Sequence, residues 1–90
     1  MAEVTDNAAL NRFELHVDGH VAFAAYELAP GVVTFTHTVS PKELQGRGAG
    51  SKLARGALDM VRSRGLKVMA KCPFIAAFIQ KNREYQDLLT

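Results

Sequence analysis

Residues 45–50 read Gln45-Gly46-Arg47-Gly48-Ala49-Gly50, and this stretch decides how the chain is interpreted. Glycine carries no β-carbon, so its repeated use here lets the main chain turn sharply and lets a ligand come close to the backbone. The stretch lies between a segment with strand periodicity and a segment with helix periodicity. The first amides of a helix have no partner inside the helix and attract anions. The turn is therefore a candidate diphosphate site, with a mobile surface loop as the alternative.

Before the turn, apolar and polar side chains alternate, which is the period of a half-buried strand. Two turn signals, Asp18-Gly19 and Ala29-Pro30-Gly31, divide this region into an antiparallel meander. The predicted strands cover residues 13–17, His20–Leu28 and Val32–Val39. In the third strand, strict alternation puts one set of side chains on a common face: Val33, Phe35, His37 and Val39.

After the turn, the apolar residues of Ala49–Val61 recur at helical spacing, and Gly65 predicts the end of that helix. Leu66–Ala70 is expected to form a short fourth strand. Pro73–Asn82 then predicts a second helix, because proline suits a first helical turn, with Cys72 as the approximate N-cap. The expected fold class is α+β in βββαβα order, a mixed and mostly antiparallel sheet with two helices.

The charge is distributed unevenly along the 90 residues. Residues 1–41 carry one basic and five acidic side chains, whereas residues 42–90 carry ten basic and four acidic ones. Such a split indicates that the second half meets an anion, although a solvated helix face is the alternative. We expect residues 1–10 to be frayed and residues 11–90 to form a single domain with a small core.

Composition narrows the class of protein. Apolar residues make up 48% and charged residues 22%, which is ordinary for a soluble globular protein. Apolar stretches such as Val21–Tyr26 are too short to cross a bilayer, and no secretory leader is recognised. Cys72 is the single cysteine, so an internal disulfide is excluded, and no spacing of ligating residues predicts a metal site. We therefore expect a cytoplasmic protein without a membrane partner or a bound metal.

Two well-known phosphate loops fit the glycine turn poorly. A P-loop needs Gly-x-x-x-x-Gly-Lys-[Ser/Thr], and Gly50-Ser51-Lys52 lacks that spacing. A dinucleotide fingerprint directly follows the first strand of a parallel unit and precedes an acidic residue by about 20 positions. Here an antiparallel meander comes first, and Ala70 occupies the comparable position.

A third pattern fits better. Gln45-x-x-Gly48-x-Gly50 resembles the [Arg/Gln]-x-x-Gly-x-[Gly/Ala] motif of the GNAT acetyltransferase superfamily. The stretches Thr36–Gly48, Gly65–Val68 and Cys72–Ile75 resemble its small single-domain members, so the likeness covers about residues 13–88. The resemblance implies a minimal GNAT-like domain that uses acetyl-CoA as a co-substrate. It also implies acetyl transfer to the amine of a small molecule or a peptide.

The same resemblance implies where the coenzyme lies. The strand edge near Val39 would pair with the pantetheine arm, and the backbone amides of the turn would hold the pyrophosphate. The basic helix face with Lys52 and Arg55 would meet the adenosine phosphates. The implied coenzyme-binding residues are Val39, Gln45, Gly46, Arg47, Gly48, Ala49, Gly50, Ser51 and Lys52.

The catalytic groups are less well defined. GNAT proteins often carry a tyrosine on the last helix that protonates the departing thiolate, but Phe78 and Ile79 occupy the comparable stretch. Cys72 is a candidate that accepts the acetyl group or acts on the leaving thiol, because a helix N-terminus stabilises a thiolate. A buried, inert cysteine is the other interpretation. His37 is a candidate base, although the face it shares with Phe35 favours a hydrogen-bonded core histidine.

Three functions are open at the level of the sequence: an N-acetyltransferase, a non-catalytic coenzyme A or acyl-CoA-binding module, and a small nucleic-acid binder. A nucleic-acid partner is disfavoured because the basic half lacks interleaved, exposed-looking aromatic residues. Larger GNAT domains shape the acceptor site with extra N-terminal helices, for which this chain has no room. Acceptor binding would then be shallow, or would be completed by a partner or by a second copy in an oligomer.

Overall fold

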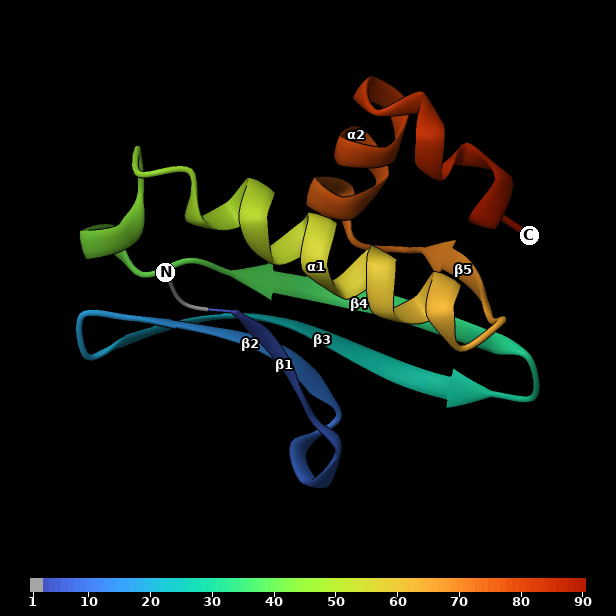
Figure 1. Ribbon diagram of the computed structural model, residues 1–90, viewed down its shortest axis with the longest axis horizontal. Coiled ribbons are helices and arrows are strands. Elements are labelled where there is room, and N and C mark those ends of the chain that lie inside the picture. Colours follow the sequence, from blue (N-terminus) through green and yellow to red (C-terminus); the bar gives the residue numbers. More distant parts are fainter. Residues whose placement is uncertain (1–2) are drawn as a thin grey trace.

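A computed structural model describes residues 3–90 and shows a sheet with both α-helices packed on one face (Figure 1). The strands are β1 (Val4–Asn7), β2 (Arg12–Val17), β3 (His20–Ala29), β4 (Val32–Val39) and β5 (Lys67–Ala70). The α-helices are α1 (Ala49–Ser63) and α2 (Pro73–Lys81), and the short 3-10 helices are η1 (Ala8–Leu10), η2 (Lys42–Leu44) and η3 (Arg83–Leu88). No helix in residues 3–90 is both long enough and apolar enough to cross a membrane.

The strands lie in the order β1-β2-β3-β4-β5. Neighbours are antiparallel from β1 to β4, whereas β4 and β5 are parallel and are connected through α1. Gly19 (φ 79°) and Gly31 (φ 74°) turn the chain in the left-handed region that glycine tolerates best. The predicted α+β class, the mixed sheet and the two helices are confirmed.

The N-terminal segment differs from the prediction. We expected residues 1–10 to be frayed, but β1 pairs with β2 and places Val4 opposite Leu15. Val4 is buried against Gly56 of α1, where a β-carbon on residue 56 would collide with the Val4 side chain. The expectation is wrong for Val4–Leu10, because pairing and tertiary contact order a segment whose sequence is mostly polar. Residues 1 and 2 lie outside the described residues.

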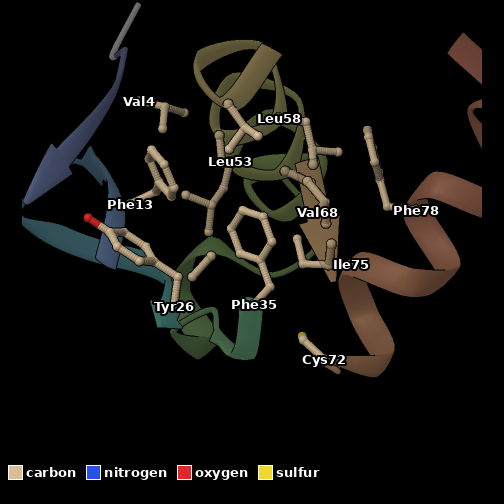
Figure 2. Packing of buried hydrophobic residues seen from close by; sticks show 14 of the residues in the cluster. Val4, Phe13, Tyr26, Phe35, Leu53, Leu58, Val68, Cys72, Ile75 and Phe78 are labelled. Atoms are coloured by element: carbon tan, nitrogen blue, oxygen red, sulfur yellow. The ribbon is translucent and has the colours of Figure 1, made fainter. Parts of the chain in front are cut away.

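The core lies between the sheet and the helices (Figure 2). Phe13 and Phe35 from the sheet are fully buried against Leu53 and Leu58 of α1 and Ile75 of α2. The opposite face of the sheet is covered by no helix within residues 3–90. Both α-helices therefore pack on one side, and each follows the C-terminal end of one of the two parallel strands, α1 after β4 and α2 after β5.

Candidate functional site

Strand β4 changes its pattern halfway along its length. Phe35 pairs with Tyr26 of β3, but His37 pairs with Ala25, so Thr36 is an extra residue in β4. This insertion is a β-bulge, which bends a strand and changes the face to which later side chains point. The Thr36 Oγ1 atom donates a hydrogen bond to the Ala25 carbonyl at 3.3 Å.

The bulge overturns the predicted orientation of His37 and Val39. Strict alternation put both on the buried face with Phe35, but His37 is exposed and Val39 is 41% exposed. The His37 ring lies edge-on to Phe23, with 5.9 Å between ring centroids. The prediction of a core histidine is therefore wrong. Thr38 takes the inward position instead.

Strands β4 and β5 separate just beyond Phe35. The Phe35 carbonyl accepts from the backbone amides of both Lys71 (3.1 Å) and Cys72 (3.0 Å). Cys72 then stands at the N-cap of α2, buried at the rim of the core (Figure 2). Its Sγ atom lies 3.2 Å from the Thr38 Oγ1 atom. Thr38 is thus a neighbour of Cys72 that sequence reasoning missed, because no sequence signal marked the bulge.

The glycine turn follows β4 and the short helix η2. Leu44 is almost fully buried and anchors the turn to the core. Gly46 (φ 80°) and Gly48 (φ 76°) adopt left-handed backbone conformations, and the space beside each Cα atom is open. These two glycines are therefore required by the backbone conformation, while also leaving room for a ligand.

The backbone amides of the turn divide into used and available donors. The amides of Gln45 and Arg47 donate within the turn, to the carbonyls of Lys42 (3.2 Å) and Leu44 (3.2 Å). The first backbone bond of α1 runs from the Lys52 amide to the Gly48 carbonyl at 3.0 Å. The amides of residues 49–51 consequently have no acceptor within the helix, and the positive end of the helix dipole lies beside them.

Two adjoining hollows form a groove along this turn. The first has a volume of about 260 Å³ and is lined by Ser40, the turn, Ser51 and Phe74. The second, about 320 Å³, lies between α1 and α2. Its walls include Arg55, Phe74, Phe78, Lys81 and Asn82. Ser51 and Phe74 line both hollows, so the two hollows meet at these residues, one beside the end of β4 and the other in the gap between the helices.

Phe74 contributes to the groove rather than to the core. It is 40% exposed, whereas Phe78, four residues further along α2, is buried. The ring lies against Gly50, where an added β-carbon would come within 3.0 Å of the Phe74 Cζ atom. Gly50 does not adopt a left-handed conformation. The absence of a side chain at Gly50 therefore allows the Phe74 ring to pack closely against α1.

The side chains of Arg47 and Lys52 lie on the other side of the turn. An Arg47 Nη2 atom donates to the Asp18 carboxylate at 2.9 Å. Both cations line a third hollow of about 340 Å³, with Leu15 and Leu44 also in its walls. The turn thus borders hollows on both sides, since Gly48 and Ala49 line this hollow as well as the one beside α2, and the two cationic side chains lie on the β2 side.

Two arginines of α1 are paired with acidic side chains of the C-terminal segment. Arg62 pairs with Asp87 at 2.8 Å, and this hydrogen bond keeps the pKa of Asp87 below its usual value. Arg55 pairs with Glu84 at 3.4 Å. Within residues 3–90, neither Lys52 nor Lys81 has an ion-pair partner. The same residues contain no cluster of His, Cys, Asp and Glu that could hold a metal ion.

A parallel strand pair that separates partway along β4, followed by a glycine turn at which a helix begins, defines a minimal GNAT-like α+β domain. The sequence model of the GCN5-related N-acetyltransferase family matches residues 12–88. The chain therefore belongs to the GCN5-related N-acetyltransferase family. It is similar to the NMR solution structure of a GCN5-like protein from Staphylococcus aureus, with 27% identity, a TM-score of 0.75, and 98% of this chain and 87% of that chain covered. A search of curated proteins finds no match.

Proposed function

We propose that this protein binds acetyl-CoA along the glycine turn and transfers the acetyl group to the amine of a small molecule or a peptide. The observation that carries the proposal is the groove of two adjoining hollows beside the separated strands. It joins the end of β4, the available amides at the start of α1 and the gap between the helices. These three parts of the groove, in this order, would suit an elongated ligand with a diphosphate in its middle.

Different residues of the groove would contact the pyrophosphate, the pantetheine arm and the nucleotide of the coenzyme. The amides of residues 49–51 would hold the pyrophosphate, because a helix N-terminus favours anions. Paired residues of β4 and β5 end at Phe35 and Ala70. The backbone of β4 near Val39 is thus no longer paired with β5 and is available to the amides of the pantetheine arm. Arg55 and Lys81 would face the nucleotide end.

Cys72 is the proposed reacting group. Acetyl-CoA supplies an acetyl group already activated as a thioester. The Cys72 thiol lies at the separated strand ends, and the Thr38 hydroxyl at 3.2 Å orients it. In one route the Cys72 thiol loses its proton to a base and its sulfur takes the acetyl group, as the coenzyme leaves as a thiolate; the amine then takes the acetyl group from Cys72. In the other route the amine attacks the thioester directly, and the Cys72 thiol donates a proton to the departing coenzyme thiolate. In both routes the amine nitrogen loses a proton to solvent or to a base, and Cys72 ends as the thiol.

His37 is the proposed base for an amine that approaches from the open face of the sheet. Its side chain projects to the face opposite Thr38, because successive residues of a strand alternate. His37 is exposed and so accessible from that side. On this basis the coenzyme and the amine would reach the separated strands from opposite faces.

A non-catalytic coenzyme-binding module is the second candidate, and a specific observation favours it. Helix α2 carries the buried Phe78 where related enzymes often use a tyrosine as the acid, and Cys72 itself is only 2% exposed. A buried thiol next to one hydroxyl can serve packing alone. Binding without turnover is what this candidate predicts.

The decisive experiment compares wild type with Cys72→Ala and a control, Ser63→Ala, whose site lies at the far end of α1. Calorimetry measures acetyl-CoA binding, and thiol release with a panel of amines measures transfer. We expect Cys72→Ala to lower the transfer rate at least about a hundred-fold. The dissociation constant for acetyl-CoA should stay within about two-fold of the wild-type value, because the main-chain donors are untouched.

The possible outcomes separate the candidates. Unchanged turnover in Cys72→Ala would remove Cys72 from the mechanism. Tight binding of acetyl-CoA by the wild type without thiol release for any amine would favour the module. Failure of the wild type to bind acetyl-CoA would reject both.

A further inference from the structure

Arg55 occupies a central position in the hollow between α1 and α2. Its guanidinium carbon lies 5.6 Å from the ring centroids of both Phe78 and Tyr85. One nitrogen donates to the Asn82 side-chain oxygen at 3.3 Å, and the other donates to the Tyr85 hydroxyl at 3.3 Å and to the Glu84 carboxylate at 3.4 Å. Arg55 is therefore held from several directions at once.

The partners of Arg55 differ in how firmly they are fixed. Tyr85 is buried and its hydroxyl donates to the Asp59 carboxylate at 2.7 Å, so its oxygen is fixed beneath the guanidinium. Burial, and then the bond to Asp59, raise the pKa of Tyr85, so the hydroxyl keeps its proton at neutral pH. Glu84 instead has a side chain that is 58% exposed and makes the longest of these contacts. Glu84 is consequently the partner that is easiest to displace.

A phosphate would compete effectively with the Glu84 carboxylate for the Arg55 guanidinium. Arginine binds phosphate through paired hydrogen bonds, and such charge-assisted bonds are stronger when two nitrogens take part. Lys81 lines the same hollow and has no ion-pair partner within residues 3–90. A phosphate that replaces the Glu84 carboxylate would therefore gain a second cation, which Glu84 does not contact.

We propose that Glu84 is an internal competitor for Arg55, and that a phosphate at the nucleotide end of the coenzyme displaces it. This inference rests on the proposed coenzyme site. Tyr85 and Asp59 are positioning residues in this arrangement, since they keep Arg55 in the hollow whichever anion it binds. Glu84 would make the hollow selective, because only a ligand whose phosphate reaches Arg55 can replace the lost ion pair.

The test uses coenzyme A and 3′-dephospho-coenzyme A as probes, with calorimetry on the full chain. The variants are Glu84→Gln and the matched control Asp87→Asn, which removes the same charge from the same segment but pairs with Arg62 outside the groove. An exposed ion pair contributes little, so Glu84→Gln should bind coenzyme A about two- to five-fold more tightly. Its affinity for the dephospho form should not change, and Asp87→Asn should match wild type with both probes.

Other results would overturn the inference in identifiable ways. If the wild type binds coenzyme A but Glu84→Gln binds it no more tightly, Glu84 is not a competitor. If Asp87→Asn tightens binding equally, the effect is one of net charge alone. An equal gain for both probes would contradict the assigned selectivity. A wild type that binds neither probe would instead show that the proposed function itself has failed.

Discussion

The parallel strands β4 and β5 differ between their two ends. At one end Val32–Phe35 pair with Lys67–Ala70, and Phe35 and Val68 are fully buried. At the other end the bulge at Thr36 is followed by separated strands, where Thr38 and Cys72 meet and the glycine turn begins. Packing and the proposed chemistry are thus divided along a single pair of strands. The paired end stabilises the domain, and the separated end leaves backbone groups available to a ligand.

The largest expected effect tests the paired end. Phe35→Ala should lower the free energy of unfolding by about 3 to 5 kcal/mol, because it removes a fully buried ring and leaves a cavity. Thr38→Val, three residues along the same strand, should cost less than about 1.5 kcal/mol. Urea denaturation monitored by circular dichroism measures both variants. Equal losses in the two variants would contradict the division between the ends.

A smaller effect on the free energy of unfolding is expected from pH, through Tyr26 of β3, which pairs with Phe35. Burial, and then the hydrogen bond to Asp6, raise the pKa of Tyr26 to about 12. The unfolded chain loses this proton near pH 10. The stabilisation from protonated Tyr26 is therefore complete below pH 10 and is lost as the pH rises through about 12.

We expect the free energy of unfolding to fall by about 2 to 3 kcal/mol across that interval because of Tyr26. Denaturation series at several alkaline pH values measure this slope. Tyr26→Phe should be less stable than wild type at neutral pH, since it loses the bond to Asp6, and should show a shallower alkaline slope. Identical slopes in the two proteins would contradict the assignment.

The smallest expected change in stability lies at the separated end, in the glycine turn. Gly48→Ala should cost about 1 to 2 kcal/mol, because φ of 76° is unfavourable for alanine. Gly48→Asn should cost less, since asparagine tolerates the left-handed region. Denaturation measures both losses, and calorimetry measures acetyl-CoA binding.

Comparing Gly48→Ala with Gly48→Asn distinguishes the effect of backbone strain on stability from the effect of an added side chain on ligand binding. Both add a side chain beside the available amides, so both should weaken acetyl-CoA binding, whereas only Gly48→Ala should weaken the fold substantially. Normal binding by Gly48→Asn would show that the ligand does not approach the turn at this position.

The sequence indicated most of the fold because the periodic segments are long enough to be recognised. The helix of Ala49–Ser63 and the strand of Val32–Val39 lie close to their predicted bounds. Strand β1 was missed because Val4 is the one residue of Val4–Asn7 with a clear apolar side chain. Its order depends on pairing with β2 and on contact with Gly56, and neither is a local property.

The candidate site was predictable in part. The glycine turn was recognised from its spacing, and the structure places it at the start of α1. The directions of side chains were not predictable: Arg47 points to Asp18 instead of along the groove, and Phe74 lines the groove while Phe78 of the same helix is buried. The bulge at Thr36 exchanged the faces expected for the next two residues: His37 is exposed, and Thr38 points toward Cys72.

By itself, the sequence determined the family, the order of the main elements from β2 onward and the position of the turn, because motif spacing, hydrophobic period and glycine conformation are local properties. Only the tertiary structure decided which side chains meet: Thr38 with Cys72, Arg55 with Tyr85 and Glu84, and Phe74 with Gly50. The physical reason is that a bulge, a strand separation or a helix contact depends on residues far apart in the chain. Their joint packing fixes orientations that no short segment specifies.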